Sequence, residues 1–374
     1  MQIGILTQYY GSCNYGGLLQ AYALARVLNG MGHSAEQICY DAKSYVDLRG
    51  NAKKTRSGLR RRLSILSQAI LQMRIKKGLK SREQKFAKFR ERISHSEQVY
   101  SNESIVATNE IYDAFVAGSD QIWNPKDYDP VFFLSFANSE KIKMSYAASI
   151  SQGQLDENQQ KLFKEHLKDF DAVSLRENDA HLIQNLSPVD VEWVLDPTFI
   201  LSKEEWDEVA APRMIDEKYV LCYILGKDEN IRNVAKEFAK KKNLKLVTMP
   251  HLNGLFEKSD SGFGDKQVFA SPEEFISLIK NAEYVITDSF HATAFSTIYE
   301  KEFFVFHRSG FKGMASRIES ILSIIGAKDH FCDDADKATV EYVSSIEPID
   351  FNKTTEFAEF KKKSLSFLQN NLNR

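Results

Sequence analysis

Hydrophobic and polar positions follow a strand–helix–strand pattern twice along this chain. In the first half, an apolar strand over residues 2–7 precedes a helix with one apolar face over 16–31 and a second strand over 34–40. In the second half, an apolar strand starts at 218, an amphipathic helix covers 229–242, and the strand LKLVTM follows. Such units build parallel sheets. The pattern therefore predicts an α/β protein with two domains.

Further periodic segments complete the first predicted domain. Strands are expected at 114–117, 143–147, 172–175 and 192–195, with helices over 157–169 and 177–185. Pro197 and Pro212 interrupt the pattern, so the boundary falls near residues 197–216. This gives a first domain over 1–200, a second domain over 215–350, and a C-terminal helical segment over 351–374 that we expect to cross back to the first domain.

Length and charge restrict the class of protein. With 374 residues, the chain is too long for one ordinary core and fits two domains. Its 49 Lys and Arg residues nearly balance 51 Asp and Glu residues. This balance argues against a nucleic-acid partner.

One segment departs from this balance, within a predicted helical insertion over about 43–100. Residues 43–92 contain 17 basic and three acidic residues, a net charge of +14, which leaves −16 for the rest of the chain. Apolar residues such as Leu59, Leu63 and Ile70 recur at helical spacing among arginines and lysines, as in a basic amphipathic helix. Two interpretations stay open: a solvated insertion packed on a domain, or a surface helix over 53–80 that contacts anionic lipid or an anionic acceptor.

The cysteines and the apolar runs indicate in which cellular compartment the protein is expected. Cys13, Cys39, Cys222 and Cys332 lie far apart without a CxxC pair, which indicates neither a disulfide framework nor a zinc site. The start, MQIGILTQYYG, lacks the order of a signal peptide, and no apolar run is long enough to span a membrane. We expect a cytoplasmic protein, at the inner face of the membrane if the basic helix binds lipid.

Polar residues gather directly after the predicted strands. Open parallel sheets bind ligands outside the carboxyl ends of their strands, so these residues are candidates for a site. The candidates in the first domain are Asn14, Tyr15, Gly16, Gly17, Asp120, Gln121, Trp123, Asn124 and Arg176. The candidates in the second domain are Ser289, His291, Arg308 and Lys312, and Arg317 further along the chain is an additional candidate cation.

The segment YVITDSFHATAFST, residues 284–297, is the most informative of these. Its apolar strand stops at Asp288 and Ser289, and the helix that follows carries His291 in its first turn. Backbone N–H groups point outward at a helix N-terminus, so an imidazole there suits an anion. The first domain has a similar strand, loop and helix near Gly16, which predicts two sites that face one cleft.

Each candidate also has a structural interpretation. Asn14, Gly16 and Gly17 can cap a helix and form a tight turn, and Asp120 can close an Asx turn. The remaining candidates can serve in a helix cap or in surface charge pairs: His291 in the cap, Arg176 with Glu177 in a pair, and Arg308, Lys312 and Arg317 along a solvated edge.

Five motifs resemble those of the polysaccharide pyruvyl transferases. In chain order they are NYGGLLQAYAL, FVAGSDQIWN, SLREND, VLDPTFIL and TDSFHATAFS. Each is weakly specific alone, but together they cover most of the chain outside residues 43–92. The resemblance implies a fold like that of the GT-B glycosyltransferases, in which two Rossmann-like domains face each other across the active site.

The resemblance also implies the activity and its partners. The family transfers pyruvate from phosphoenolpyruvate to two hydroxyls of a sugar in a surface polysaccharide or its precursor, forming a pyruvate ketal and releasing phosphate. This chemistry needs no metal and no further cofactor. The expected partners are phosphoenolpyruvate and a sugar or lipid-linked oligosaccharide acceptor. Arg176 and His291 align with residues that hold phosphoenolpyruvate in the family.

The chemistry of phosphoenolpyruvate fits the candidate residues. Its carboxylate and phosphate need several close cations and hydrogen-bond donors. The expected donor-binding residues are Arg176, His291, Ser289, Arg308, Lys312 and Arg317. Transfer also needs an acid and a base, so His291 is assigned as acid or phosphate ligand and Asp120 as base or acceptor-orienting group. The expected acceptor-binding residues are Asn14, Tyr15, Gly16, Gly17, Gln121, Trp123 and Asn124.

Two other functions stay open. A sugar-nucleotide-dependent glycosyltransferase can have the same architecture, because the fold does not determine the donor. A non-catalytic protein that binds a glycan or an anion can keep the fold without turnover. Against the first, the second domain shows no convincing pair of acidic residues for a nucleotide ribose.

Overall fold

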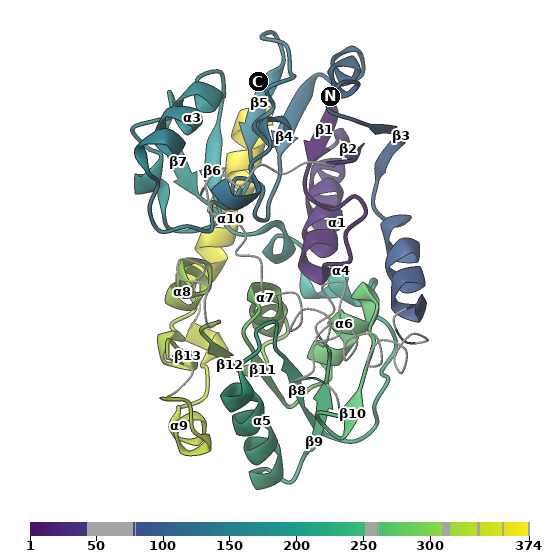
Figure 1. The fold of residues 1–374 in the computed structure, drawn as a ribbon, viewed down its shortest axis with the longest axis vertical. Coiled ribbons are helices and arrows are strands. Elements are labelled where there is room, and N and C mark those ends of the chain that lie inside the picture. Colours follow the sequence, from purple (N-terminus) through teal and green to yellow (C-terminus); the bar gives the residue numbers. More distant parts are fainter. Residues whose placement is uncertain are drawn as a thin grey trace, which may run out of the picture.

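The computed structural model describes residues 1–42, 78, 80–250, 260, 262–308, 315–334, 337–353 and 355–372. Most of the predicted basic helix over 53–80 lies outside the described residues, and so does Lys312. Two α/β units lie one above the other in the view of Figure 1. None of the helices in the described ranges is long and apolar enough to cross a membrane.

The first domain is built on a parallel sheet with β1 at its centre. The strand order is β3-β2-β1-β4-β5, and isolated bridges connect the pair β6-β7 to the β5 side. The strands are β1 (Gln2–Leu6), β2 (Ser34–Tyr40), β3 (His95–Tyr100), β4 (Ala114–Ala117), β5 (Ile142–Ser145), β6 (Val173–Leu175) and β7 (Val191–Trp193). The helices of this part are α1 (Tyr15–Gly30), α3 (Glu157–Leu167) and α4 (Lys203–Asp207).

The second domain repeats this plan around β8. Its strand order is β10-β9-β8-β11-β12-β13, and every pairing is parallel. The strands are β8 (Tyr219–Tyr223), β9 (Lys245–Thr248), β10 (Lys266–Gln267), β11 (Tyr284–Thr287), β12 (Glu302–Phe306) and β13 (Phe331–Cys332). The helices are α5 (Glu229–Lys241), α6 (Pro272–Lys280), α7 (Phe290–Ile298), α8 (Ser316–Ile324), α9 (Val340–Ser345) and α10 (Thr355–Leu372).

In each sheet, the strand order along the sequence reverses at one strand, and we call this place the chain reversal of that sheet. In the first sheet β1 lies between β2 and β4, and in the second β8 lies between β9 and β11. At such a place, the loops after two neighbouring strands run to opposite sides of the sheet. A crevice therefore opens between them, at the carboxyl ends of the two strands. The loops after β1 and β4, and those after β8 and β11, are therefore the places to look for a binding site.

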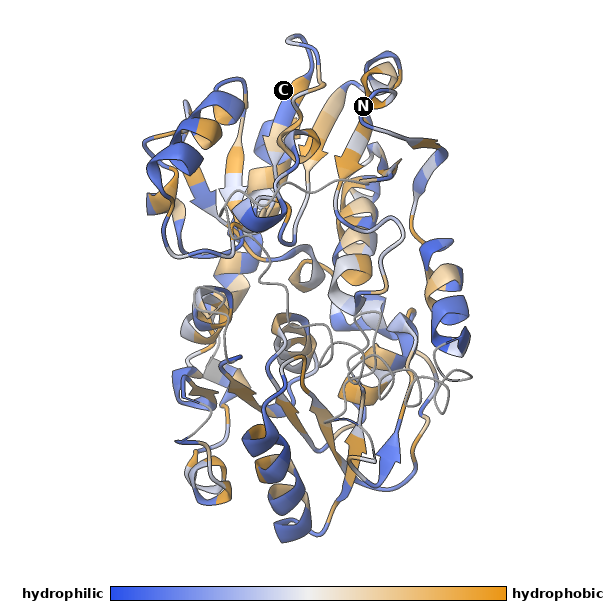
Figure 2. Cartoon of the chain, in the orientation of Figure 1, coloured by the Kyte–Doolittle hydropathy of each residue, from blue (hydrophilic) through white to orange (hydrophobic). Residues whose placement is uncertain are grey.

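The apolar runs of the sequence form the inner strands. Every residue of β4 and β8 is buried, as expected for parallel strands with both faces covered. Figure 2 shows the strands mostly in hydrophobic colours and the peripheral helices α3 and α5 mostly in hydrophilic ones. Three helices begin at a capping box, in which the cap and the third helical residue bind each other's backbone: Asp156 with Gln159, Ser202 with Glu205 and Ser271 with Glu274.

Two local predictions differ from the structure. The helix predicted over 177–185 is wrong, because that segment contains only a short 3-10 turn at Ala180–Leu182. Its first residues turn inward, where the buried Glu177 accepts a hydrogen bond from Ser149. Strand β3 was not predicted, because an edge strand that reads HSEQVY lacks an apolar period.

An apolar interface joins the two domains. A single hydrophobic cluster contains residues of both. At its centre, the ring of Trp206 lies 5.8 Å from that of Tyr22 in α1 and 4.9 Å from that of Phe295 in α7. Tyr15 stacks on Phe275 of α6 at 4.8 Å, and its hydroxyl donates a hydrogen bond to a backbone carbonyl of the second domain. The relative position of the domains is therefore fixed by close packing.

The C-terminal helix α10 returns to the first domain, where Figure 1 shows it in yellow beside β5 and β6. Ser364 accepts a hydrogen bond from the backbone N–H of Leu195 at 2.9 Å. The ring of Phe360 lies 4.5 Å from that of Trp193, and Phe367 packs near Tyr146. The chain thus leaves the second domain after α9 and ends in a helix that packs on the first domain.

We predict that Leu368→Ala, which removes a fully buried side chain of α10 (0% exposed), lowers the free energy of unfolding by about 2–5 kcal/mol. The loss should appear as a lower melting temperature in thermal unfolding. The exposed neighbour Gln369 provides the control, since Gln369→Ala should change stability by less than about 0.5 kcal/mol. Equal melting temperatures for the two variants would show that α10 does not stabilise the fold.

Candidate active site

A cavity of about 160 Å³ lies where the two chain reversals face each other. Both domains line it. The predicted residues that the first domain contributes are Asn14, Tyr15, Gly16, Asp120 and Gln121. Those that the second domain contributes are Ser289, His291, Arg308 and Arg317. The structure thus brings together candidates as far apart in the sequence as Asn14 and Arg317.

Next to the cavity, the carboxylate of Asp196 meets Arg176 of the first domain and His291 of the second. Its Oδ2 atom lies 2.9 Å from Nη1 of Arg176 and 3.7 Å from Nε2 of His291. The same oxygen accepts a hydrogen bond from Ser119, and Oδ1 accepts two from the N–H and hydroxyl of Thr198. Asp196 is only 1% exposed. This buried carboxylate therefore links a residue that follows β6 to a residue of α7.

The surroundings of Asp196 favour its charged form. Burial alone raises the pKa of this carboxyl, but His291, Arg176 and the Thr198 N–H together hold the pKa well below its usual range. Ionised carboxylates that have lost water are stable only with such partners.

Arg176 is enclosed by charge and by aromatic surface. Its Nη2 lies 3.3 Å from Oδ1 of Asp120, and its guanidinium lies 4.5 Å from the centre of the Phe290 ring. Both Arg176 and Glu177 are buried, so the interpretation of these two residues as a surface ion pair is wrong. Arg176 does not line the cavity itself. It holds the two carboxylates Asp120 and Asp196 in place beside it.

Asp120 lies in an unusual backbone conformation. Its φ of 72° is in the left-handed region, which residues other than glycine rarely adopt. The carbonyl of Asp120 accepts a hydrogen bond from the N–H of Ser149 at 2.9 Å, which helps to hold this turn. Strained backbone of this kind clusters at functional sites, and here it directs a carboxylate to the cavity wall.

His291 is not the cap of its helix. Ser289 caps α7 by accepting from the N–H of Ala292, and Nε2 of His291 is buried without a hydrogen-bond partner among the described residues. On the other side of the ring, a Cβ added to Gly16 would lie 1.9 Å from Nδ1 of His291. The first turn of α1 therefore contacts His291 across the domain boundary, and position 16 has no room for a side chain.

Two arginines of the second domain reach the cavity. Arg308 binds Asp288, with 3.1 Å between its Nε and Oδ2 of Asp288. Arg317 is 6% exposed, and no described residue forms a hydrogen bond or an ion pair with it. Burial, and then repulsion from Arg176, outweigh the attraction of Glu177 and Asp120 and lower the pKa of Arg317 to about 10, so it is still charged at neutral pH. The prediction of a solvated edge is therefore wrong for Arg317.

Some predicted site residues have other roles. Trp123 is 1% exposed, stacks on Phe133 at 5.2 Å and donates its indole N–H to a backbone carbonyl. It belongs to the core, so its prediction as an acceptor-binding residue is wrong. Asn124 caps a short 3-10 turn and binds Gln121 rather than lining the cavity. Asn14 lines the cavity but also caps α1 by accepting from Gly16 and Gly17.

The sequence did not single out three residues that shape this region. Asp196 stands in the motif VLDPTFIL directly after an apolar strand, which is the signal that identified Asp120. The sequence placed Asp288 at the end of a predicted strand. It did not predict that the backbone N–H groups of Leu225 and Gly226 donate to its carboxylate. Arg82 lies in the basic segment and donates to the Cys13 carbonyl at 2.7 Å, with its guanidinium over Phe86.

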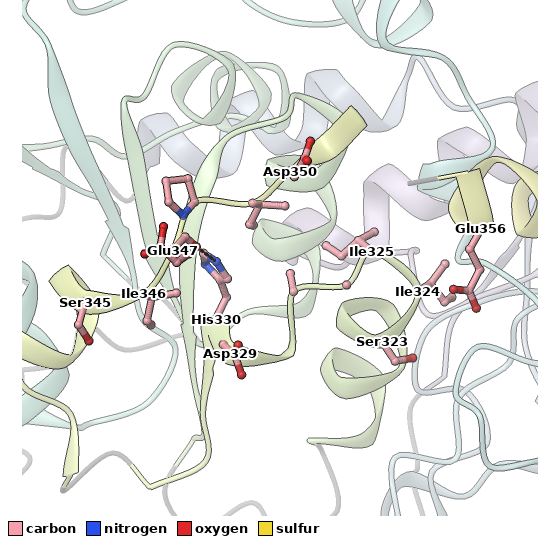
Figure 3. Close-up of a pocket in the computed structure, with 14 residues that line it drawn as sticks. Ser323, Ile324, Ile325, Asp329, His330, Ser345, Ile346, Glu347, Asp350 and Glu356 are labelled. Atoms are coloured by element: carbon pink, nitrogen blue, oxygen red, sulfur yellow. Dashed lines mark hydrogen bonds between the residues drawn. The ribbon is translucent and has the colours of Figure 1, made fainter. Parts of the chain in front are cut away.

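A larger cavity of about 600 Å³ lies elsewhere in the second domain, between the end of α8 and the loop after α9 (Figure 3). Four acidic residues line it: Asp329, Glu347, Asp350 and Glu356. The one basic side chain there, His330, is bound to backbone carbonyls. Acidic walls repel anions, so this cavity does not suit an anionic donor.

The family model of the polysaccharide pyruvyl transferases matches residues 14–310. The chain therefore belongs to the polysaccharide pyruvyl transferase family, whose members are transferases that act in polysaccharide pyruvylation. The resemblance seen in the five motifs is thereby confirmed. No curated protein matches the sequence.

Solved structures share the fold at low sequence identity. The UDP-GlcNAc 2-epimerase of Methanocaldococcus jannaschii has a TM-score of 0.53 at 11% identity, over 99% of this chain and 100% of that one. The UDP-GlcNAc 2-epimerase of Neisseria meningitidis, solved with UDP-GlcNAc bound, has a TM-score of 0.50 at 11% identity, over the whole of both chains. These likenesses confirm the fold alone: two facing Rossmann-like domains of the GT-B type.

We predict different outcomes for two neighbouring glycines of α1. Gly16→Ala should displace His291 and lower the melting temperature, because the new methyl group overlaps the imidazole. Gly17→Ala is the matched control, since the nearest atom to its Cβ would be 3.6 Å away. Alanine favours helices by up to about 1 kcal/mol over glycine, so this control should be neutral or stabilising. A Gly16→Ala protein as stable as the control would contradict the close contact with His291.

A second prediction concerns Asp196. Asp196→Asn should lower the free energy of unfolding by about 3–5 kcal/mol near neutral pH, because it leaves Arg176 buried without its main partner. The folded-state pKa of Asp196 lies below its unfolded value of about 3.9, so its contribution is present above about pH 4 and is lost as the pH falls further. Denaturant unfolding at several pH values measures this difference. Asp190→Asn, at an exposed position, should show no comparable loss.

Proposed function

We propose that this protein transfers pyruvate from phosphoenolpyruvate to two hydroxyls of a sugar in a surface polysaccharide or its precursor, forming a pyruvate ketal and releasing phosphate. The observation that carries the proposal is the buried guanidinium of Arg317, which lines the cavity with no carboxylate within ion-pair distance among the described residues and whose Nε lacks a hydrogen-bond partner there. A buried, unpaired charge is costly. An anionic ligand in the cavity would remove that cost.

Among the described residues, Arg317 has no carboxylate within ion-pair distance, and this favours an anionic ligand beside it. Arg176 is matched by Asp120 and Asp196, and Arg308 by Asp288. Arg317 has no such match, and the Nε2 atom of His291 lacks a hydrogen-bond partner. A phosphate and a carboxylate on one short carbon frame can accept from the guanidinium of Arg317 and lie beside the His291 ring, which also lines the cavity. We therefore assign Arg317, His291, Ser289 and Arg308 to the donor.

Cavity size supports the same donor over a nucleotide sugar. The volume of about 160 Å³ is below the range of about 300–1,000 Å³ that is typical of pockets for drug-sized ligands. A three-carbon donor suits this space better than a nucleotide diphosphate sugar. The glycosyltransferase alternative is less consistent with this geometry.

The reaction needs two proton movements. The methylene carbon of phosphoenolpyruvate takes up a proton while one sugar hydroxyl adds to the neighbouring carbon. The second hydroxyl then displaces phosphate from that carbon, so one hydroxyl proton ends on the new methyl group and the other on phosphate. We propose His291 as acid or phosphate ligand and Asp120 as base, because both line the cavity from opposite domains. Arg176 would act by positioning Asp120.

The acceptor would approach from the side of the first domain, where Gln121 and the loop before α1 border the cavity. A lipid-linked acceptor would suit a protein that touches anionic membranes through residues 53–80. That contact stays a prediction from the sequence.

The first test measures phosphate release from phosphoenolpyruvate with a pool of candidate acceptor glycans, and the mass increment of a pyruvate ketal on the product. Thermal shift separates the alternatives, because a bound ligand raises the melting temperature. Stabilisation by phosphoenolpyruvate but not by nucleotide sugars is expected. The reverse result would favour the glycosyltransferase, and stabilisation without turnover would favour a binding protein.

For Arg317 we predict opposite effects on binding and stability. Arg317→Gln should weaken phosphoenolpyruvate binding by about tenfold or more, because a charge-assisted hydrogen bond is worth about 1.5–3 kcal/mol. The empty variant should be as stable as the parent or more so, since a desolvated unpaired charge has been removed. Calorimetric titration and thermal unfolding measure the two effects. Lys236→Gln, which removes an exposed cation of α5, should change neither.

A further inference from the structure

At the chain reversal of the second sheet, a carboxylate fills the turn after β8. Asp288 follows β11, and its two oxygens accept hydrogen bonds from consecutive backbone N–H groups in the loop after β8. Leu225 donates to Oδ1 at 2.7 Å and Gly226 donates to Oδ2 at 2.7 Å. The Asp288 side chain is 0% exposed. Both oxygens of a single carboxylate are thus held by one turn of backbone.

Such a pair of amides is a typical phosphate position. In open α/β sheets, the turn after the central strand presents backbone N–H groups to phosphate at the change of strand order. Here that turn follows β8, lies between β8 and β11, and precedes the helix α5. Gly226 also allows close approach, because a Cβ at this position would lie 3.1 Å from Oδ2 of Asp288. The carboxylate therefore occupies the place that a phosphate would need.

Asp288 also fixes a cation. Nε of Arg308 lies 3.1 Å from Oδ2 of Asp288, and Nη2 donates to the backbone carbonyl of the same residue at 3.1 Å. Two contacts to one residue hold the guanidinium at the cavity edge, where Arg308 is a lining residue. Arg308 is thus oriented by the side chain that fills the amide pair.

We propose that Asp288 is an internal substitute for a phosphate group and a determinant of donor class. It fills the amide pair of the loop after β8, so that the diphosphate of a nucleotide donor cannot bind the second domain there. At the same time it positions Arg308 for the smaller anion in the cavity. The second part rests on the proposed function, whereas the first does not.

The test combines two substitutions with a small-molecule rescue. Asp288→Ala should leave the two amides without an acceptor and open space for a free carboxylate. Acetate should then shift the amide resonances of Leu225 and Gly226, raise the melting temperature by about 2 °C or more and lower the KM for phosphoenolpyruvate. Acetamide, which has the same shape but no charge, should do none of this. Asp288→Asn keeps the space filled, so it should not respond to acetate.

The kinetic readout separates positioning from bulk stability. Both variants should raise the KM for phosphoenolpyruvate by about tenfold or more, as expected when one partner of a buried charge pair is removed. In the parent, UDP should leave the amide resonances of Leu225 and Gly226 unchanged. Shifts of both resonances with UDP in the parent would overturn the first part of the proposal, even if Asp288→Ala does not fold.

Failure of this proposal differs from failure of the proposed function. An unchanged KM in Asp288→Asn, or no response of folded Asp288→Ala to acetate, would overturn the role of Asp288 while the parent still releases phosphate from phosphoenolpyruvate. Absence of phosphate release in the parent, together with acetate-dependent shifts of the two amides in Asp288→Ala, would overturn the donor assignment and leave the filled amide pair standing.

Discussion

The buried carboxylate of Asp196 is the contact on which the arrangement of the site depends. It receives Arg176 from the first domain and faces His291 from the second. A carboxylate this deep is stable only while cations and donors surround it. The apolar interface around Trp206 holds the two domains together. Within that interface, the charge of Asp196 holds Arg176 of the first domain next to His291 of the second.

Hydrophobic periodicity predicted most of the fold, because strands such as β4 and β8 are buried on both faces and read as unbroken apolar runs. It missed β3, whose exposed polar face carries no such signal, and it placed a helix after Arg176 where the charged side chains turn inward instead. For the site, the strand-end rule found Asp120, His291 and Arg308, and the need for more cations around a phosphate pointed to Arg317. It could not find pairings such as Asp288 with the loop after β8, because those partners lie more than sixty residues away.

The likeness to the two epimerases extends to the fold and not to the ligand. Fold likeness at 11% identity leaves the ligand undetermined. In this chain, the two chain reversals differ in how their charged groups are paired. The amide pair of the second domain is occupied by Asp288, while Arg317 is left without a partner among the described side chains. An anion would therefore bind beside the amide pair rather than on it.

An unpaired arginine inside a folded protein has a stability cost that packing alone does not explain. Natural proteins retain such costs where function requires them. Because a ligand that binds only the folded state stabilises it, the anion that pairs with Arg317 would stabilise the closed arrangement of both domains. Since His291 contacts α1 at Gly16 and borders the same cavity, donor binding and the packing of the two domains would be linked at that imidazole.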